Sequence, residues 1–322
     1  MTGPAVLVTG ADRYLGGRLA ARLTADDRVA RVMTAATDDL LSPASNGRSK
    51  LTELLADGRV CTVVHLAIGA STSRTRSRSE LKERNVIGTM QLLAACQRSP
   101  HVRRVVVKSA AAAYGASIRD PAIFTEDTEL RAVPRGEYTK DVLDAEGYVR
   151  GFARRRPEIE VTVLRLAPLI GPKADTAMSR YFALPLVPTV LGFDPRVQFL
   201  HIDDAVDVLH HATVRPHPEP PERHDRPTVL NVGGPGAMPL SQAIRRARGI
   251  AAPVPEFALS GLAALGSIDV SRDQLDFLRY GRVMDVSRLV ETYGINPLPT
   301  PEAFDAVFGA KSGTEFGTAE EA

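Results

Sequence analysis

The alternation of short apolar runs with amphipathic stretches constrains the fold of this chain most strongly. Residues 5–9 (AVLVT) lead through Gly10 into a helical pattern at 15–23, so the chain begins as a strand, a tight turn and a helix. The same alternation continues to about residue 171. It predicts strands at 29–36, 61–68, 102–108 and 161–166, and helices at 49–57, 79–98 and 138–155. Strands that alternate with helices form a parallel sheet covered on both faces, so the fold class is α/β.

From residue 172 the pattern changes to proline-rich segments, a strand at 228–232, and helices at 240–248 and 272–280. We therefore expect a Rossmann-type, doubly wound parallel sheet with a smaller α+β C-terminal lobe. The expected parts are a Rossmann-type domain (1–171), a second lobe interleaved with it (172–310) and a disordered tail (311–322). The segment PHPEPPERHDRP at 216–227 is predicted to be an exposed loop.

Composition narrows the class of partner. The chain is 44% hydrophobic and 24% charged with a net charge of +2, which is typical of a soluble globular protein and argues against nucleic acid or a membrane surface as partner. It contains no apolar run of about 18 residues, so no membrane span is expected. Cys61 and Cys96 form no metal-ligand spacing and fit a reducing cytoplasm. We expect a cytoplasmic protein that binds a small molecule between its lobes.

A series of motifs gives a resemblance to a known family. The chain carries in order VLVTG, VVHLA, NVIGT, SAAAAYG, LRLAPLIGP, FLHIDDA and NVGG. This order resembles the extended short-chain dehydrogenases, the NAD-dependent epimerase/dehydratase family. It is most similar to an actinobacterial branch described as sugar-nucleotide epimerase-like. The resemblance implies a nicotinamide dinucleotide site and a homodimer formed through the helices at 79–98 and 138–155.

The phosphate-binding turn departs from the family pattern TGxxGxxG. Gly10 and Gly16 are present, but Arg13 replaces the middle glycine. Its side chain could block a pyrophosphate, or could turn outward and pair with a phosphate. The two glycines could equally be kept for the turn and for helix–strand packing alone. If a cofactor binds, the resemblance places Gly10, Arg13, Gly16, Leu66 and Ala67 against it.

The adenosine side also departs from the family. Ala36 stands where NAD-dependent members carry an acidic residue, and Asp38 and Asp39 are expected to be solvated loop residues. Only 24 residues separate Ala36 from Cys61, so the family's third strand is predicted to be lost. We expect no cofactor or a weakly bound one. Because no acid repels a 2′-phosphate and Arg13 could attract one, NADP is expected over NAD.

The catalytic group of the family is Ser/Thr, Tyr and Lys. Tyr138 is present, but the lysine position four residues later is Val142 and the serine position is Ala110. Lys140 lies about 200° around the helix and cannot replace the missing lysine. A tyrosine with a pKa near 10 is a poor general base at neutral pH. The sequence therefore predicts that the family's hydride transfer is lost.

Several other residues also bear on the site and its surroundings. Pro168 replaces the asparagine with which relatives hold a nucleotide diphosphate, which argues against such a substrate. His65 and His201 are expected to be structural, Asn85 to tie a strand to a helix, and Asp203 or Asp204 to cap a helix. The polar groups expected at the cleft floor are Tyr138, Ser109, Lys108, Tyr114, His65 and His201. Among them, the catalytic candidates are Tyr138, Ser109 and Lys108, and no metal site is expected.

Three functions remain open at this point. We favour a non-redox enzyme of the isomerase, lyase or cyclase type, which needs only a positioned proton donor and acceptor. The second possibility is a ligand-binding or scaffold pseudoenzyme without turnover. The third is an NADP-dependent reductase or epimerase, the usual activity of the family that the chain resembles.

Overall fold

The computed structural model describes residues 3–42, 49–57, 59–70, 77–130, 136–215, 226–259 and 271–309. Its centre is a sheet of six parallel strands in the order β10-β5-β4-β3-β1-β2. The strands are β1 (Ala5–Thr9), β2 (Arg31–Ala35), β3 (Thr62–His65), β4 (Arg104–Ala110), β5 (Glu160–Leu166) and β10 (Thr228–Val232). The predicted α/β class and Rossmann-type parallel sheet are confirmed.

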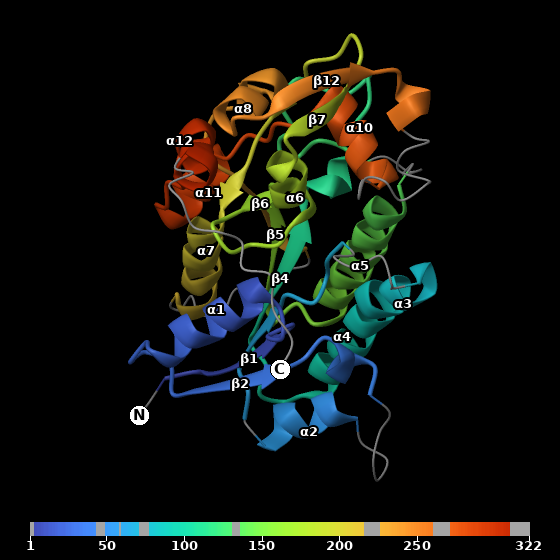
Figure 1. The fold of residues 1–322 in the computed structure, drawn as a ribbon. Helices are drawn as coiled ribbons and strands as arrows, with labels where there is room; N and C mark the ends of the chain where they lie inside the picture. The colour runs from blue at the N-terminus through green and yellow to red at the C-terminus, as the bar shows by residue number, and fades with distance from the viewer. Residues whose placement is uncertain are drawn as a thin grey trace, which may run out of the picture.

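Helices cover both faces of this sheet (Figure 1). Val6 and Val8 of β1 pack against one group of helices, whereas Leu7 packs against the other, because successive side chains of a strand point to opposite faces. Burial on both faces explains the consecutive apolar residues at the centres of the inner strands, such as residues 6–8 of β1 and 105–107 of β4. The first group is α1 (Tyr14–Thr24), α7 (Ile202–Val214) and α11 (Ser287–Tyr293). The second is α2 (Lys50–Asp57), α4 (Gly88–Arg98) and α5 (Glu137–Arg155).

Among the described residues, β2 is the last strand at its edge of the sheet. The described residues between these strands hold the 3-10 turn η1 (Asp38–Leu40) and α2, and no strand. Losing a strand at the edge of a sheet leaves the inner hydrogen-bond ladders intact.

The helix predicted at 79–98 is interrupted by a wider turn. It consists of α3 (Arg78–Lys82), the π-helical turn η2 (Glu83–Ile87) and α4. Asn85 in that turn accepts a hydrogen bond from Gly69 N, and donates to Gly69 O and to Asp141 Oδ2, all at 3.1 Å. Asn85 thus ties the loop after β3 to η2 and α5, which confirms its predicted structural role.

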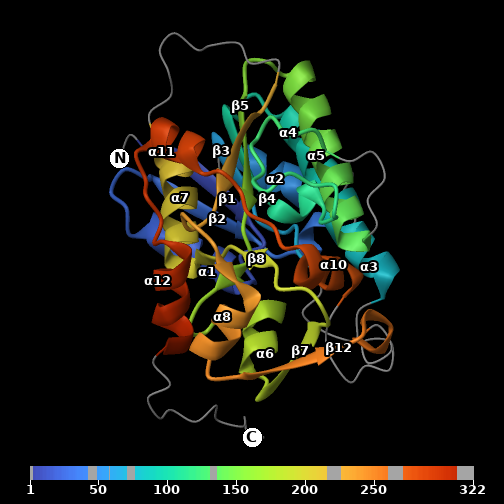
Figure 2. The same ribbon diagram turned by 90° about the horizontal axis from the view of Figure 1, so that it is seen from above.

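The second lobe lies at the carboxyl ends of the strands (Figure 1) and has its own core of aromatic and aliphatic side chains. Its parallel pair of strands is β7 (Leu186–Val190) and β12 (Ile250–Val254). Its α10 (Arg272–Tyr280) lies beside α5 in both ribbon views (Figures 1 and 2). The remaining elements are β6 (Leu169–Ile170), α6 (Ala177–Ala183), β8 (Arg196–Val197), β9 (Leu200–His201), β11 (Met238–Pro239), α8 (Leu240–Arg246) and α12 (Thr300–Phe304).

Some predictions fall outside these residues or stay untested. The predicted tail at 311–322 and most of the predicted loop at 216–227 lie outside the described residues. The domain boundary at 171, the homodimer and the cytoplasmic location stay predictions. Across the described ranges, no helix combines the length and apolar character that crossing a membrane requires.

Candidate functional site

A cavity of about 540 Å³ lies where the carboxyl ends of the central strands meet the second lobe. Its inner wall comes from the turn after β1, the loop after β3 and the ends of β4 and β5, and its outer wall from α6 and α10. In open parallel sheets, ligands bind at this end of the strands. The cavity brings together Arg13, Gly16, Leu66, Lys108, Ser109 and Tyr138 of the predicted site.

Two positions in the turn after β1 require glycine, because backbone atoms lie too close to leave room for a Cβ. Gly10 has φ +74°, and a Cβ there would meet the backbone of Ala67 and Leu66, whereas a Cβ on Gly16 would overlap Gly10 O. Gly10 and Ala67 therefore lie behind the cavity wall and fix its shape. Helix α1 has no side-chain cap and no acidic residue in its first turn, so its N-terminal amides suit an anion.

Arg13 is the N-cap residue of α1, and its side chain runs along the cavity wall. A Cβ built on Gly69 would overlap Arg13 Nη1, so the guanidinium lies against the loop that follows β3. Burial lowers the pKa values of Lys108 and His65, and the charge of Arg13 lowers them further. For Tyr138 the same charge opposes the rise in pKa that burial causes. This position places a cation beside the phosphate-binding turn.

Two aspartates near β2, Asp12 and Asp39, form hydrogen bonds that the sequence did not predict. Asp12 accepts hydrogen bonds from the backbone N–H of Thr37 at 2.8 Å and from its hydroxyl at 3.0 Å. Asp39 accepts from Ala36 N at 2.8 Å and pairs with Lys50 at 2.6 Å. Expecting Asp39 to be merely solvated was wrong, because its carboxylate stabilises the turn after β2.

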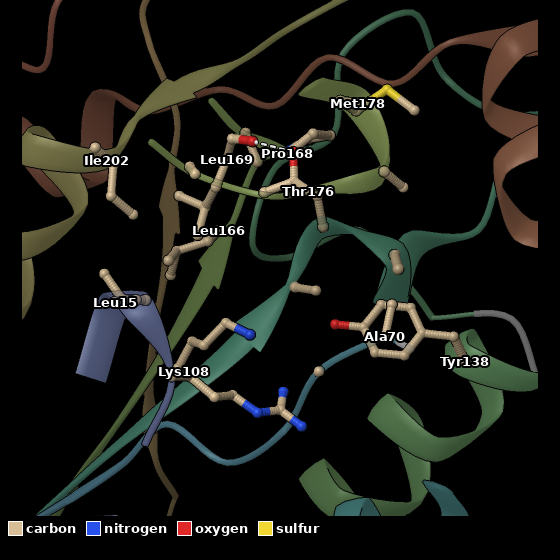
Figure 3. Close-up of a pocket in the computed structure, with 18 of the residues that line it drawn as sticks. Leu15, Ala70, Lys108, Tyr138, Leu166, Pro168, Leu169, Thr176, Met178 and Ile202 are labelled. Atoms are coloured by element: carbon tan, nitrogen blue, oxygen red, sulfur yellow. Dashed lines mark hydrogen bonds between the residues drawn. The ribbon is translucent and has the colours of Figure 1, made fainter. Parts of the chain in front are cut away.

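Tyr138 lies in the first turn of α5 and points into the cavity (Figure 3). Burial raises its pKa to about 12, although the charge of Arg13 acts in the opposite direction. Val142, one turn later, is fully buried in the core, and Lys140 is exposed. Within the described part of the chain, no cation donates a hydrogen bond to the Tyr138 hydroxyl. The phenol therefore stays protonated at neutral pH.

Lys108 enters the same cavity from the opposite wall (Figure 3). Its Nζ donates a hydrogen bond of 2.5 Å to Ile68 O. Burial, together with the charge of Arg13, lowers its pKa to about 7. Because side chains two residues apart on a strand share a face, Lys108 lies on the same face of β4 as Ala110, about 6.6 Å along the strand. Lys108 thus puts a titratable amine close to the vacated serine position.

Ser109 belongs to a buried network instead of facing a ligand freely. Its hydroxyl donates to Glu146 Oε1 at 2.6 Å, and Glu146 accepts two further hydrogen bonds from Arg165. Arg165 also donates to the Tyr114 hydroxyl, which in turn donates to Asn231 Oδ1 at 2.7 Å. These bonds join α5, β4, β5 and β10 beneath the cavity, so Ser109 has a structural partner.

The predicted histidines are structural, in agreement with the sequence. His65 is buried between the hydroxyls of Thr9 at 2.7 Å and Thr89 at 2.9 Å, and burial lowers its pKa to about 3. His201 is the N-cap residue of α7 and accepts from Asp203 N at 3.3 Å. The prediction that Asp203 or Asp204 caps this helix was wrong. The expectation that His65, His201 and Tyr114 lie at the cleft floor was wrong, because none of the three lines the cavity.

Sequence reasoning missed two charged residues at and after α10. Asp273 accepts hydrogen bonds from Tyr138 N and Thr139 N, each at 3.2 Å, and so caps α5 from the second lobe. Gly136 is required beside it, because a Cβ there would overlap the Asp273 carboxylate. Arg282 follows α10 and completes the outer wall. Only three-dimensional contact identifies these residues, since neither lies in a motif.

The fold and the site define an extended short-chain dehydrogenase-like protein. They combine a Rossmann-type sheet with a glycine turn, a tyrosine on α5 and a ligand cavity between two lobes. The sequence profile of the NAD dependent epimerase/dehydratase family matches residues 6–233. The chain therefore belongs to this family, as its motifs predicted.

The chain is similar in sequence to several proteins, of which two are informative. An uncharacterized protein of Mycobacterium tuberculosis is 43% identical over 94% of this chain and 83% of its own length. A chloroplastic epimerase family protein of Arabidopsis thaliana is 25% identical over 84% of this chain and 78% of its own length. The mycobacterial relative supports the predicted actinobacterial branch.

Solved structures match the whole fold. MoeE5 in complex with UDP-glucuronic acid and NAD has a TM-score of 0.69 at 22% identity, covering 95% of this chain and 98% of its own. TunA, an NAD-dependent NDP-hexosamine 5,6-dehydratase, gives 0.66 at 23% identity, covering 95% and 96%. UDP-glucuronic acid 4-epimerase from Bacillus cereus in complex with NAD gives 0.66 at 18%, covering 94% and 97%.

These matches correct the expectation about the cofactor. The sequence predicted no cofactor or a weak one, with NADP preferred, but the matching structures of MoeE5 and the Bacillus cereus epimerase contain NAD. The residues present also fit the pyrophosphate of a dinucleotide. The uncapped start of α1, the close turn at Gly10 and Gly16, and the cation of Arg13 together form an anion-binding cradle.

Proposed function

We propose that this chain is an NAD-dependent enzyme acting on a small molecule, with Lys108 in place of the family's tyrosine–lysine pair as the proton-transfer group. The observation that carries the proposal is the placement of Lys108 and Tyr138 on opposite walls of one cavity (Figure 3). A general base is most effective when its pKa lies near the working pH. Lys108, with a pKa of about 7, meets this condition, whereas Tyr138 does not.

Residues of the inner wall would hold the cofactor. The amides at the start of α1 and the guanidinium of Arg13 would bind the pyrophosphate, and Gly69 leaves space beside them. Bound NAD supplies the hydride acceptor for oxidation of a substrate carbon. Leu66 and Ala167 give this part of the wall an apolar surface that excludes water.

The proton step follows from the two side chains. A neutral Lys108 accepts the proton of a substrate hydroxyl or C–H group, while the Ile68 carbonyl holds its Nζ in position. Tyr138 remains a phenol and donates a hydrogen bond to the oxygen that becomes negative. The amine and the phenol thus divide between them the tasks that an ionised tyrosine performs in the family.

A second candidate is an isomerase, lyase or cyclase that catalyses no net redox change. It is favoured by Val142, whose complete burial leaves no side chain in the lysine position to depress the pKa of Tyr138. Lys108 and Tyr138 would then transfer protons without hydride transfer. The two candidates differ in one measurement: only the first requires NAD for turnover, either as NADH formed in step with product or as a loss of activity when NAD is removed.

The test uses the full chain and two variants. Isothermal titration should show NAD binding in the wild type and in Lys108→Gln, with NADP bound more weakly. A screen of small alcohols and hydroxy acids should give turnover in the wild type and a loss of at least about a hundredfold in Lys108→Gln. Lys140→Gln, which removes an exposed lysine of α5, serves as the control. The proposal is wrong if Lys108→Gln keeps wild-type turnover, or if NAD does not bind.

A further inference from the structure

The outer wall of the cavity carries one rigidly held cation. Arg282 follows the end of α10 and is 8% exposed. Its backbone N–H donates to Arg196 O at 3.2 Å, and Gly281 before it has φ +72°, where a Cβ would overlap the same oxygen. The backbone at Arg282 is therefore fixed against β8, and its side chain starts from one defined position.

Most of the guanidinium's hydrogen-bonding capacity is unused. Nε donates to Gly115 O at 2.6 Å, and the guanidinium lies 5.6 Å from the ring centroid of Phe277. Within the described part of the chain, Nη1 and Nη2 have no hydrogen-bond or ion-pair partner. The nearby carboxylates of Asp273, Asp120 and Asp276 favour the charge of Arg282. Its two unused Nη groups suit an anion that arrives with the ligand.

The carboxylates of the cavity wall are engaged elsewhere. Asp12 accepts from Thr37, and Asp175 forms an ion pair with Arg180. Asp273 accepts from the backbone at the start of α5. None of them forms an ion pair with Arg282 in the described residues. Nη1 and Nη2 of Arg282 are therefore available to a ligand.

The cavity wall also carries several apolar side chains. Leu166, Pro168, Leu169 and Met178 line the cavity (Figure 3). Phe277 lines it beside Arg282. A sugar carries a hydroxyl on almost every carbon, and these side chains offer it no hydrogen bonds. An apolar ring or chain would instead replace water at this wall favourably.

We propose that the substrate is a monocarboxylate with an apolar body. The carboxylate pairs with Nη1 and Nη2 of Arg282, whose fork matches two carboxylate oxygens, and the body packs between Leu169, Met178 and Phe277. A phosphate or diphosphate would carry more charge than this single guanidinium balances. This inference rests on the proposed function, because it names the substrate class of the same site.

The test measures binding by the full chain without requiring turnover. Benzoate, cinnamate and cyclohexanecarboxylate are titrated calorimetrically against their primary amides and against UDP-glucose, with and without NAD. The carboxylates should bind at least about tenfold more tightly than the amides, since the amides lose the charge-assisted pair. This difference should vanish in Arg282→Gln, shrink in Arg282→Lys, and persist in the control Lys140→Gln.

Several results would overturn the inference. In the wild type, these are equal affinity for a carboxylate and its amide, or no carboxylate binding up to about 10 mM. Tighter binding of UDP-glucose than of every carboxylate would also overturn it. So would a folded Arg282→Gln that keeps the wild-type difference in affinity between carboxylate and amide. The carboxylate–amide comparison needs no variant, so it decides even if Arg282→Gln does not fold. Failure of the proposed function appears separately, as the absence of NAD binding in the same titrations.

Discussion

The carboxylate of Asp273 accepts a hydrogen bond of 3.2 Å from the backbone N–H of Tyr138, across a sequence separation of 135 residues. Helix α5 has Gly136 at its N-cap and no capping side chain of its own. Asp273 performs that function from α10, so the second lobe fixes the first turn of the helix that carries the phenol. The position of Tyr138 therefore depends on the docking of the two lobes.

Replacing Asp273 by alanine should destabilise the chain. Loss of a helix cap costs about 1 kcal/mol, and the free N–H groups of Tyr138 and Thr139 would lie at the edge of the cavity. Urea unfolding should show this decrease in the free energy of unfolding. Asp203→Ala, which removes a half-exposed carboxylate paired with Arg18, should cost less. Equal effects of the two substitutions would contradict the capping role.

The activity of the enzyme should rise with pH through about 7. Below that value Lys108 is protonated and cannot accept a proton, and above it the amine is neutral. The pH profile of kcat/KM should therefore have an ascending limb near pH 7 in the wild type. Lys108→Arg, which stays charged throughout, should lack this limb. A wild-type profile that is flat between pH 6 and 8, measured on the enzyme's own substrate, would contradict the assignment.

The free energy of unfolding should also depend on pH through Lys108, and the direction of this dependence can be stated. The pKa of Lys108 is about 7 when folded and near 10.5 in the unfolded chain, so between these values the unfolded state binds more protons. The free energy of unfolding contributed by this residue therefore rises with pH across that window, and burying the charged amine is most unfavourable below pH 7. The difference between wild type and Lys108→Met, followed by urea unfolding from pH 6 to 10, should show this rise. A constant difference would exclude it.

Breaking the buried network beneath the cavity should be severe. Arg165 and Glu146 are 4% and 3% exposed, and Glu146→Ala leaves the guanidinium without its counterion. Removing one partner of a buried pair costs about 3–5 kcal/mol. Arg22→Ala breaks the exposed pair with Asp207 and should cost at most about 1 kcal/mol. Chemical unfolding compares them directly, and similar losses would show that the network is not energetically special.

Removing the cation of the phosphate-binding turn should weaken cofactor binding. If Arg13 contacts the pyrophosphate, Arg13→Ala should bind NAD at least about tenfold more weakly, and the affinity should depend less on salt. Arg18→Ala, on the outward side of α1, is the matched control. Tighter NAD binding by Arg13→Ala would show instead that the side chain obstructs the site.

The central sheet could be predicted because burial on both faces leaves a simple pattern. Most of its strands contain a short apolar run, such as residues 6–8 of β1 and 105–107 of β4. The loss of the family's third strand stays a prediction. The strands β7 and β12 could not be found in this way. Each contains a proline, Pro188 and Pro253, which in a sequence argues against a strand. Their pairing depends on tertiary contacts that local patterns do not reveal.

The residues of the candidate site also fall into two groups: those that the sequence identifies and those that only tertiary contacts reveal. Arg13, Lys108 and Tyr138 were found because they occupy or adjoin family motif positions, and the cavity brings them together. Asp273 and Arg282 enter the site from the far end of the chain, where no local pattern marks them. The pKa of Lys108 also could not be read from the sequence, since it arises from burial and from the charge of Arg13.

Ending the sheet at β2 has a consequence for association with other polypeptides. The outer edge of this strand exposes backbone N–H and C=O groups, and such rims can recruit a strand from another molecule and seed fibrils. Strand β2 is only five residues long, and it presents the exposed side chains of Arg31 and Thr34. A short edge with polar, exposed side chains is a poor template for adding a strand from another molecule. The described sheet can therefore end at β2 without promoting aggregation there.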